Sequence, residues 1–70
     1  MWKIHAGGLP IFSGAEADCR RLYLGYNEWQ VWQGAAAAAP LQAQIGSHPA
    51  TWTLPIELVD SGGIVKARTP

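Results

Sequence analysis

The chain has 70 residues, which allows one domain, so residues 1–70 are treated as a single small β-rich domain. Five basic and five acidic residues give a formal net charge of zero, which argues against nucleic acid as a partner, because non-specific nucleic-acid binding needs a basic surface. No stretch approaches the roughly 20 apolar residues of a membrane span, and the first twelve residues lack the apolar run of a secretory signal.

Association with other subunits is the expected source of additional stability. A domain of this size buries only about 60% of its unfolded surface, so small domains usually add a disulfide, a metal or a partner subunit. The one cysteine, Cys19, excludes an internal disulfide, and it shows no metal-binding spacing with the two histidines. Only 14% of the residues are charged and four are tryptophan, which predicts apolar surface of the kind that binds partners.

The N-terminal residues 2–6 alternate between apolar and polar side chains, and this period of two is typical of a half-buried strand. The apolar face carries Trp2, Ile4 and Ala6, and the polar face carries Lys3 and His5. Two glycines at positions 7 and 8 end the strand. The next apolar pair, Ile11–Phe12, is interpreted as a short anchor rather than as an element of its own.

The central stretch, residues 20–33, favours a hairpin. Two runs of β-favouring residues flank a turn-like centre at residues 25–28. A competing signal precedes it, because Ser13 and Glu16 match a helix capping box and Gly25 is a typical helix stop. We predict at most one short helical turn near residues 14–19, followed by strand. On such strands the inward residues are Leu22, Leu24, Trp29 and Val31, and the outward residues are Tyr23, Gln30 and Trp32.

The second half of the chain predicts further short strands. The alanine-rich segment at residues 34–40 is interpreted as a connector, and the alternating residues 41–45 as a strand. Residues 51–68 predict a second hairpin that turns at residues 61–63. Its first strand contains Pro55, which donates no ladder hydrogen bond and so indicates a sheet edge or a bulge. In total the pattern predicts a mainly β fold, a small sandwich or barrel of about five or six antiparallel strands.

No catalytic constellation is present in the sequence. The serines lie in no nucleophile elbow, and Glu57 and Asp60 would fall on opposite faces of a strand. The glycines at 62 and 63 lack the lysine of a phosphate-binding loop. We therefore expect no enzyme activity, no catalytic residues, no metal site and no cofactor.

The large aromatic residues are the candidates for partner binding, because aromatic side chains are enriched at interface hot spots and open sheet edges invite pairing with another chain. The candidate partner-binding residues are Trp2, Tyr23, Tyr26, Trp32 and Pro55. An alternative is a carbohydrate- or peptide-binding module. In that case rings between Tyr26 and Trp32 form a platform, and Asn27, Glu28 or Gln30 supply hydrogen bonds.

A short chain rich in tryptophan and alanine, with few charges and no catalytic motif, is similar in composition to small accessory proteins of virus particles, bacteriophages especially. The likeness covers no specific motif. It implies a non-enzymatic structural subunit that decorates or connects capsid or tail components and is located in the virion. Outside such a particle the expected location is the cytoplasm.

Overall fold

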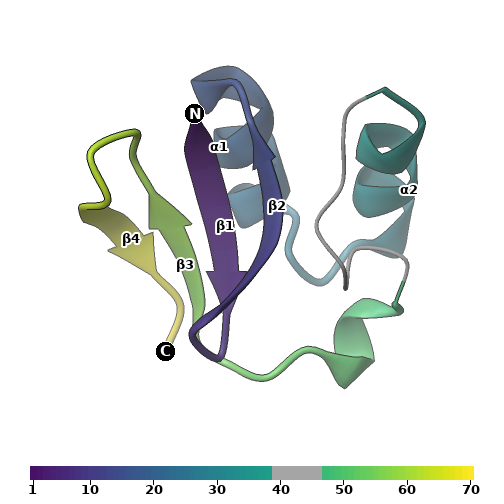
Figure 1. Ribbon diagram of the computed structural model, residues 1–70. Coiled ribbons are helices and arrows are strands. Elements are labelled where there is room, and N and C mark those ends of the chain that lie inside the picture. The colour runs from purple at the N-terminus through teal and green to yellow at the C-terminus, as the bar shows by residue number, and fades with distance from the viewer. Residues whose placement is uncertain (39–46) are drawn as a thin grey trace.

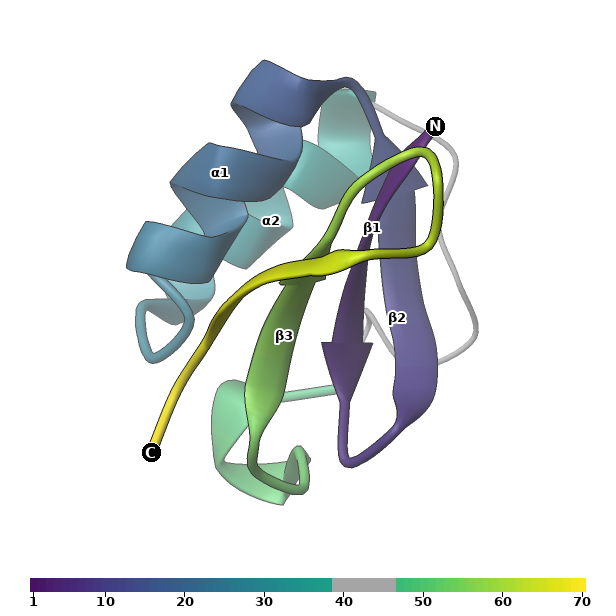
Figure 2. The same cartoon turned by 90° about the vertical axis from the view of Figure 1, so that its left-hand side faces the viewer.

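The computed structural model describes residues 1–38 and 47–70, which form an antiparallel four-stranded sheet with two α-helices on one side (Figures 1 and 2). The strand order is β2-β1-β3-β4. The prediction of a mainly β sandwich or barrel is therefore wrong, because the fold is a two-layer α+β arrangement. The elements are β1 (Trp2–Ala6), β2 (Leu9–Gly14), α1 (Glu16–Leu24), α2 (Trp29–Ala38), a 3₁₀ helix (Pro49–Thr51), β3 (Ile56–Val59) and β4 (Val65–Arg68).

Strand β1 is confirmed with the predicted bounds and the predicted inward face. Gly7 and Gly8 have φ angles of 57° and 85°, which suit glycine, and they turn the chain into β2. The interpretation of Ile11–Phe12 as an isolated anchor is wrong, because both residues belong to β2. A bulge leaves Ile11 as an extra residue opposite β1, so two consecutive side chains are buried and the alternation that marks a strand is lost.

Helix α1 replaces the predicted strand after Arg20. The helix begins after Ala15, and Ser13 lies in β2, so Ala15 and not Ser13 is the N-cap residue. Glu16 accepts a hydrogen bond of 2.8 Å from Arg20 one turn later, and the acidic first turn suits the helix dipole. Gly25 ends the helix, as the competing helical signal indicated and the preferred prediction of a strand did not, and its N–H donates to the Arg21 carbonyl.

The buried stripe of α1 holds Cys19 and Leu22, three residues apart, while Leu24 is 80% exposed. The predicted inward position of Leu24 is therefore wrong, because a helix directs every third or fourth side chain to one face and a strand every second.

Helix α2 replaces the second strand of the predicted hairpin, and it also takes up most of the predicted connector. Trp32 and Ala35 are buried three residues apart, which is the helical spacing. The alanines that follow extend the helix, because alanine has the highest helix propensity. Trp32 was expected to face outward, yet it is 0% exposed. The predicted strand at residues 41–45 lies outside the described residues.

The second hairpin is confirmed in its turn and in β4, but its first strand is shorter than predicted. A 3₁₀ helix occupies residues 49–51, and β3 begins only after the cis peptide bond between Leu54 and Pro55. Pro55 lies just before β3, and β3 lies between β1 and β4, so the prediction that Pro55 marks a sheet edge or a bulge within the strand is wrong. In the central pair of strands Ile4 lies opposite Leu58, and both side chains are buried beneath the helices.

Aromatic rings join the two layers. The Trp32 ring lies edge-on to Phe12 of β2 at 6.3 Å between centroids, and edge-on to Trp52 at 4.3 Å. Such pairs contribute beyond the area they bury. Trp32 is thus the link between α2, the sheet and the segment before β3.

Candidate functional sites

Among the described residues, no helix covers the sheet face opposite α1 and α2, and the β3–β4 hairpin crosses in front of part of this face (Figure 2). A polar row crosses it, because His5 on β1 is paired in register with Glu57 on β3, and Glu57 is paired with Arg68 on β4. Arg68 donates to the Glu57 carboxylate from Nε at 3.0 Å and from Nη2 at 2.6 Å. The Glu57 side chain is 11% exposed and that of Arg68 is 62% exposed, so the buried carboxylate is neutralised by a partner that stays in contact with water.

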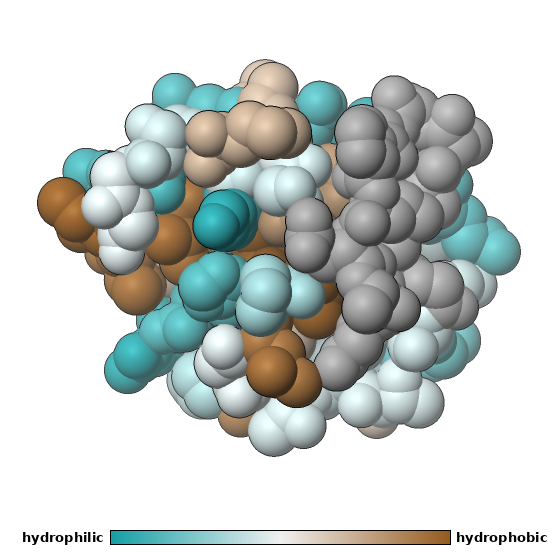
Figure 3. Space-filling model, in the orientation of Figure 1, coloured by the Kyte–Doolittle hydropathy of each residue, from teal (hydrophilic) through white to brown (hydrophobic). Residues whose placement is uncertain are grey.

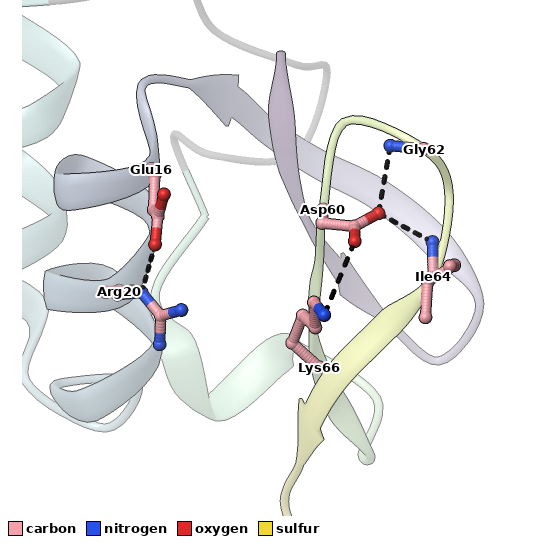
Figure 4. Close-up of polar contacts among 6 residues, drawn as sticks. All are labelled: Glu16, Arg20, Asp60, Gly62, Ile64 and Lys66. Carbon is pink, nitrogen blue, oxygen red and sulfur yellow. Dashed lines mark hydrogen bonds and ion pairs between the residues drawn. The ribbon is translucent and has the colours of Figure 1, made fainter.

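The turn of the β3–β4 hairpin is fixed by Asp60 (Figure 4). Its Oδ1 accepts hydrogen bonds from the backbone N–H groups of Ile64 and Gly62, each at 2.9 Å, and Lys66 Nζ lies 3.8 Å from Oδ2. The pKa of the Asp60 carboxyl lies below its ordinary value. The hydrogen bond from the Ile64 N–H is the largest cause, and the Gly62 N–H and the nearby Lys66 contribute less. The turn therefore presents the residues that follow it in a defined orientation.

Exposed hydrophobic residues surround this turn. Ile64 is 61% exposed, Val65 45% and Met1 69%, and these three residues are called the open-face patch. Figure 3 shows hydrophobic side chains over the β3–β4 hairpin, with hydrophilic side chains next to them. A depression of about 340 Å³ lies beside the patch, and its lining is Met1, Lys3, His5, Val59, Asp60, Ser61, Gly62 and Gly63. Apolar residues beside polar groups are typical of a partner-binding surface.

Both edges of the sheet carry features that discourage pairing with another strand. Edge strand β4 has four residues, of which Lys66 and Arg68 are basic, and a bulge interrupts its register with β3. The other edge strand, β2, contains Pro10 and a bulge. Short length, charge, proline and bulges are the usual means by which natural sheets avoid edge-to-edge association. The open-face patch is therefore a better candidate interface than either edge.

A second candidate site is a pocket of about 300 Å³ on the helical side of the molecule. The turn between α1 and α2 contributes Tyr26 and Asn27, and the segment from the 3₁₀ helix to β3 contributes the rest. The lining residues are Tyr26, Asn27, His48, Pro49, Ala50, Trp52, Leu54 and Ile56. No charged side chain is among them, and Leu54 is 52% exposed.

His48 shapes one side of this pocket. Its Nδ1 accepts a hydrogen bond of 3.2 Å from the Ala50 N–H and thereby caps the 3₁₀ helix. The ring lies 5.7 Å from the half-buried ring of Trp29, centroid to centroid. Trp52 forms part of the pocket wall, and its buried indole N–H has no hydrogen-bond partner among residues 1–38 and 47–70.

The five predicted partner-binding residues lie in different places. Trp2 is half-buried, and the Arg20 guanidinium lies over its ring at 5.0 Å. Tyr23 is half-buried against the core, and Tyr26 is half-buried in the wall of the pocket. Trp32 is enclosed in the core, and Pro55 is half-buried before β3, where its carbonyl accepts from the Gly7 N–H at 3.1 Å. Only Tyr26 belongs to either candidate site.

Apart from Tyr26, the described residues of the two sites were not among the predicted partner-binding residues. His48 and Trp52 reach Tyr26 only through tertiary packing, so no local pattern identifies them. Ile64 and Val65 follow a glycine-containing turn, and two adjacent apolar residues at a hairpin tip are the signal that identifies such a patch.

Cys19 is buried, and burial raises the pKa of its thiol to about 11. The thiol is therefore protonated at neutral pH and is a poor nucleophile. Among residues 1–38 and 47–70, no three His, Cys, Asp or Glu side chains cluster as metal ligands would. Within the same ranges, no helix has the length and apolar character needed to cross a bilayer.

No protein-family model matches the chain, and neither a curated protein nor a solved structure matches it significantly. The two sites described above are therefore the basis for the function proposed next.

Proposed function

We propose that the chain is a non-enzymatic structural subunit that binds other subunits of the same assembly, its own copies included, through the open-face patch. The supporting observation is Ile64, which is 61% exposed immediately after a turn held by Asp60. Burying a large aliphatic side chain on association is favourable by roughly 1.5–3 kcal/mol. A turn that is already ordered loses little conformational entropy when the partner binds.

The polar groups beside the patch give the interface its specificity. Lys3 and His5 line the depression, and Arg68 lies exposed in the polar row on the same face. A partner with acidic groups opposite Lys3 would complement this surface, because complementary charge selects between partners of similar shape. The composition of the chain, similar to that of virus-particle accessory proteins, supports a virion as the assembly.

The concentration dependence of the mass of the purified chain tests this proposal. Sedimentation equilibrium should show association of the unmodified chain, and I64D should weaken it at least about tenfold, because a charge in an apolar interface is left unpaired. The matched control is L24D, since Leu24 is an 80% exposed leucine on α1, outside the patch. A folded chain that stays monomeric at all concentrations would contradict the proposal, as would equal effects of the two variants.

A further inference from the structure

The pocket near Tyr26 is lined by two kinds of side chain. Trp52, Leu54 and Ile56, from the segment that leads into β3, are apolar. Tyr26, Asn27 and His48 carry polar groups. Among the described residues, the pocket shares no lining residue with the depression beside the open-face patch, so it is a separate site.

We propose that this pocket binds one neutral sugar ring. A pyranose has an apolar face of C–H groups and an edge of hydroxyl groups, and the pocket offers both apolar and polar lining residues to them. A charged ligand would find no carboxylate, lysine or arginine as counter-ion among the described lining residues. A purely aliphatic side chain would cover the polar groups of Tyr26 and Asn27 without pairing them.

Each polar residue has a defined part in this proposal. The half-buried Tyr26 offers a ring face for the C–H groups and a hydroxyl that both donates and accepts. The exposed Asn27 amide can also both donate and accept hydrogen bonds. His48 Nδ1 accepts from the Ala50 N–H, so in the neutral ring the proton is on Nε2, which donates to a sugar hydroxyl.

The size of the pocket limits the ligand to a single ring. Its volume of about 300 Å³ lies at the lower end of the range of roughly 300–1,000 Å³ that ligand pockets span. The half-exposed Leu54 at the wall leaves the site open to solvent, so the sugar can be the end of a longer glycan.

The test uses the full chain and two-dimensional ¹H–¹⁵N spectra. The probes are methyl glycosides of glucose, galactose and mannose, N-acetylglucosamine, glucuronate as the charged counterpart, and N-acetyl-leucine amide as a model of a protein side chain. At least one neutral sugar should shift the Trp52 indole N–H resonance in a saturable manner. The Trp2 indole should not move, because it lies beneath Arg20 and outside the pocket.

Two amide variants separate binding from folding. N27A should raise the Kd of the neutral sugar about tenfold, the effect of losing a hydrogen-bonding group. Q30A is the matched control, since Gln30 is an exposed amide on α2 outside the pocket, and it should leave the Kd unchanged. The proposal is overturned if no neutral sugar gives a saturable shift, if N27A and Q30A behave alike, or if glucuronate or the leucine amide binds more tightly than every neutral sugar.

Discussion

The two faces of the sheet are built from the same strands but differ in chemistry. On the helix-covered face, β1 and β3 contribute Ile4, Ala6, Ile56 and Leu58, each at most 3% exposed. On the open face the intervening positions are Lys3 and His5 of β1, which are exposed or half-buried, and Glu57 and Val59 of β3, which are buried. Because side chains alternate along a strand, the same strand contributes to the core on one face and to the opposite face of the sheet on the other. The covered face supplies most of the stability, and the open face carries the groups available to a partner.

The largest effect is expected from W32A on the covered side. Trp32 is fully buried and contacts both Phe12 and Trp52, and replacing such a residue by alanine typically costs about 3–5 kcal/mol. A chain of this length has a total stability of about 4–10 kcal/mol, so the variant should be largely unfolded or close to it. Urea unfolding followed by circular dichroism measures the loss. L24A, an exposed position on α1, should change stability by no more than about 0.5 kcal/mol.

A smaller effect is expected from E57A, which removes the buried carboxylate of the open face. The cost should be about 1–2 kcal/mol, below that of breaking a fully buried pair, because the Arg68 guanidinium remains hydrated. A double-mutant cycle with R68A, read by urea unfolding, isolates the pair. Additive effects of the two substitutions would show that the 2.6 Å contact contributes no coupling energy.

Acid should weaken the hairpin turn at Asp60. Because the folded-state pKa of this carboxyl lies below the ordinary 3.8, its stabilising effect is present above pH 3.8 and is lost as the pH falls through the folded-state value. The difference in unfolding free energy between the unmodified chain and D60N should therefore shrink between pH 5 and pH 2. The adjacent S61A removes none of these hydrogen bonds and should keep the same acid dependence. If the difference in unfolding free energy between the unmodified chain and D60N stays constant across this pH range, the Asp60 carboxylate does not stabilise the turn in the way described.

The smallest effect on stability is expected from I64D. Ile64 is mostly exposed, so the free energy of unfolding should change by no more than about 0.5 kcal/mol while association is lost. Comparing the unfolding free energies of I64D and W32A tests directly whether the covered face, and not the open face, supplies most of the stability. An I64D chain that unfolds as readily as W32A would show that the open-face patch belongs to the folded core.

Some of this fold is predictable from the sequence, and the strands at the two ends show why. β1 has one buried and one solvated face, so its pattern has a clean period of two, and the two glycine-rich turns need backbone conformations that favour glycine. For residues 16–38 strands were predicted where the structure has helices. Tyrosine, tryptophan and valine favour strands only weakly, and tertiary packing overrides that preference. The helical signal was the spacing of Cys19 with Leu22 and of Trp32 with Ala35.

The sites were less predictable than the strands. The turn at residues 25–28 drew attention to Tyr26 and Asn27, which line the pocket, although it joins two helices rather than two strands. His48 and Trp52 join them across the fold, and a single sequence does not encode that proximity in any local pattern. Of the aromatic residues that were expected to bind partners, Trp32 is enclosed in the core, and Trp2, Tyr23 and Tyr26 pack half-buried against it, because a small core needs bulky side chains.

The central pairing of β1 with β3 has a consequence for how the chain folds. Each terminal hairpin is local and can form within about 1–10 µs, but the contact of Ile4 with Leu58 requires closure of a loop that contains both helices. Non-local pairing of this kind slows folding. During synthesis the apolar face of β1 has no central partner until β3 has emerged. The nascent chain therefore has an interval of exposed apolar surface, in which early encounters with other chains compete with folding.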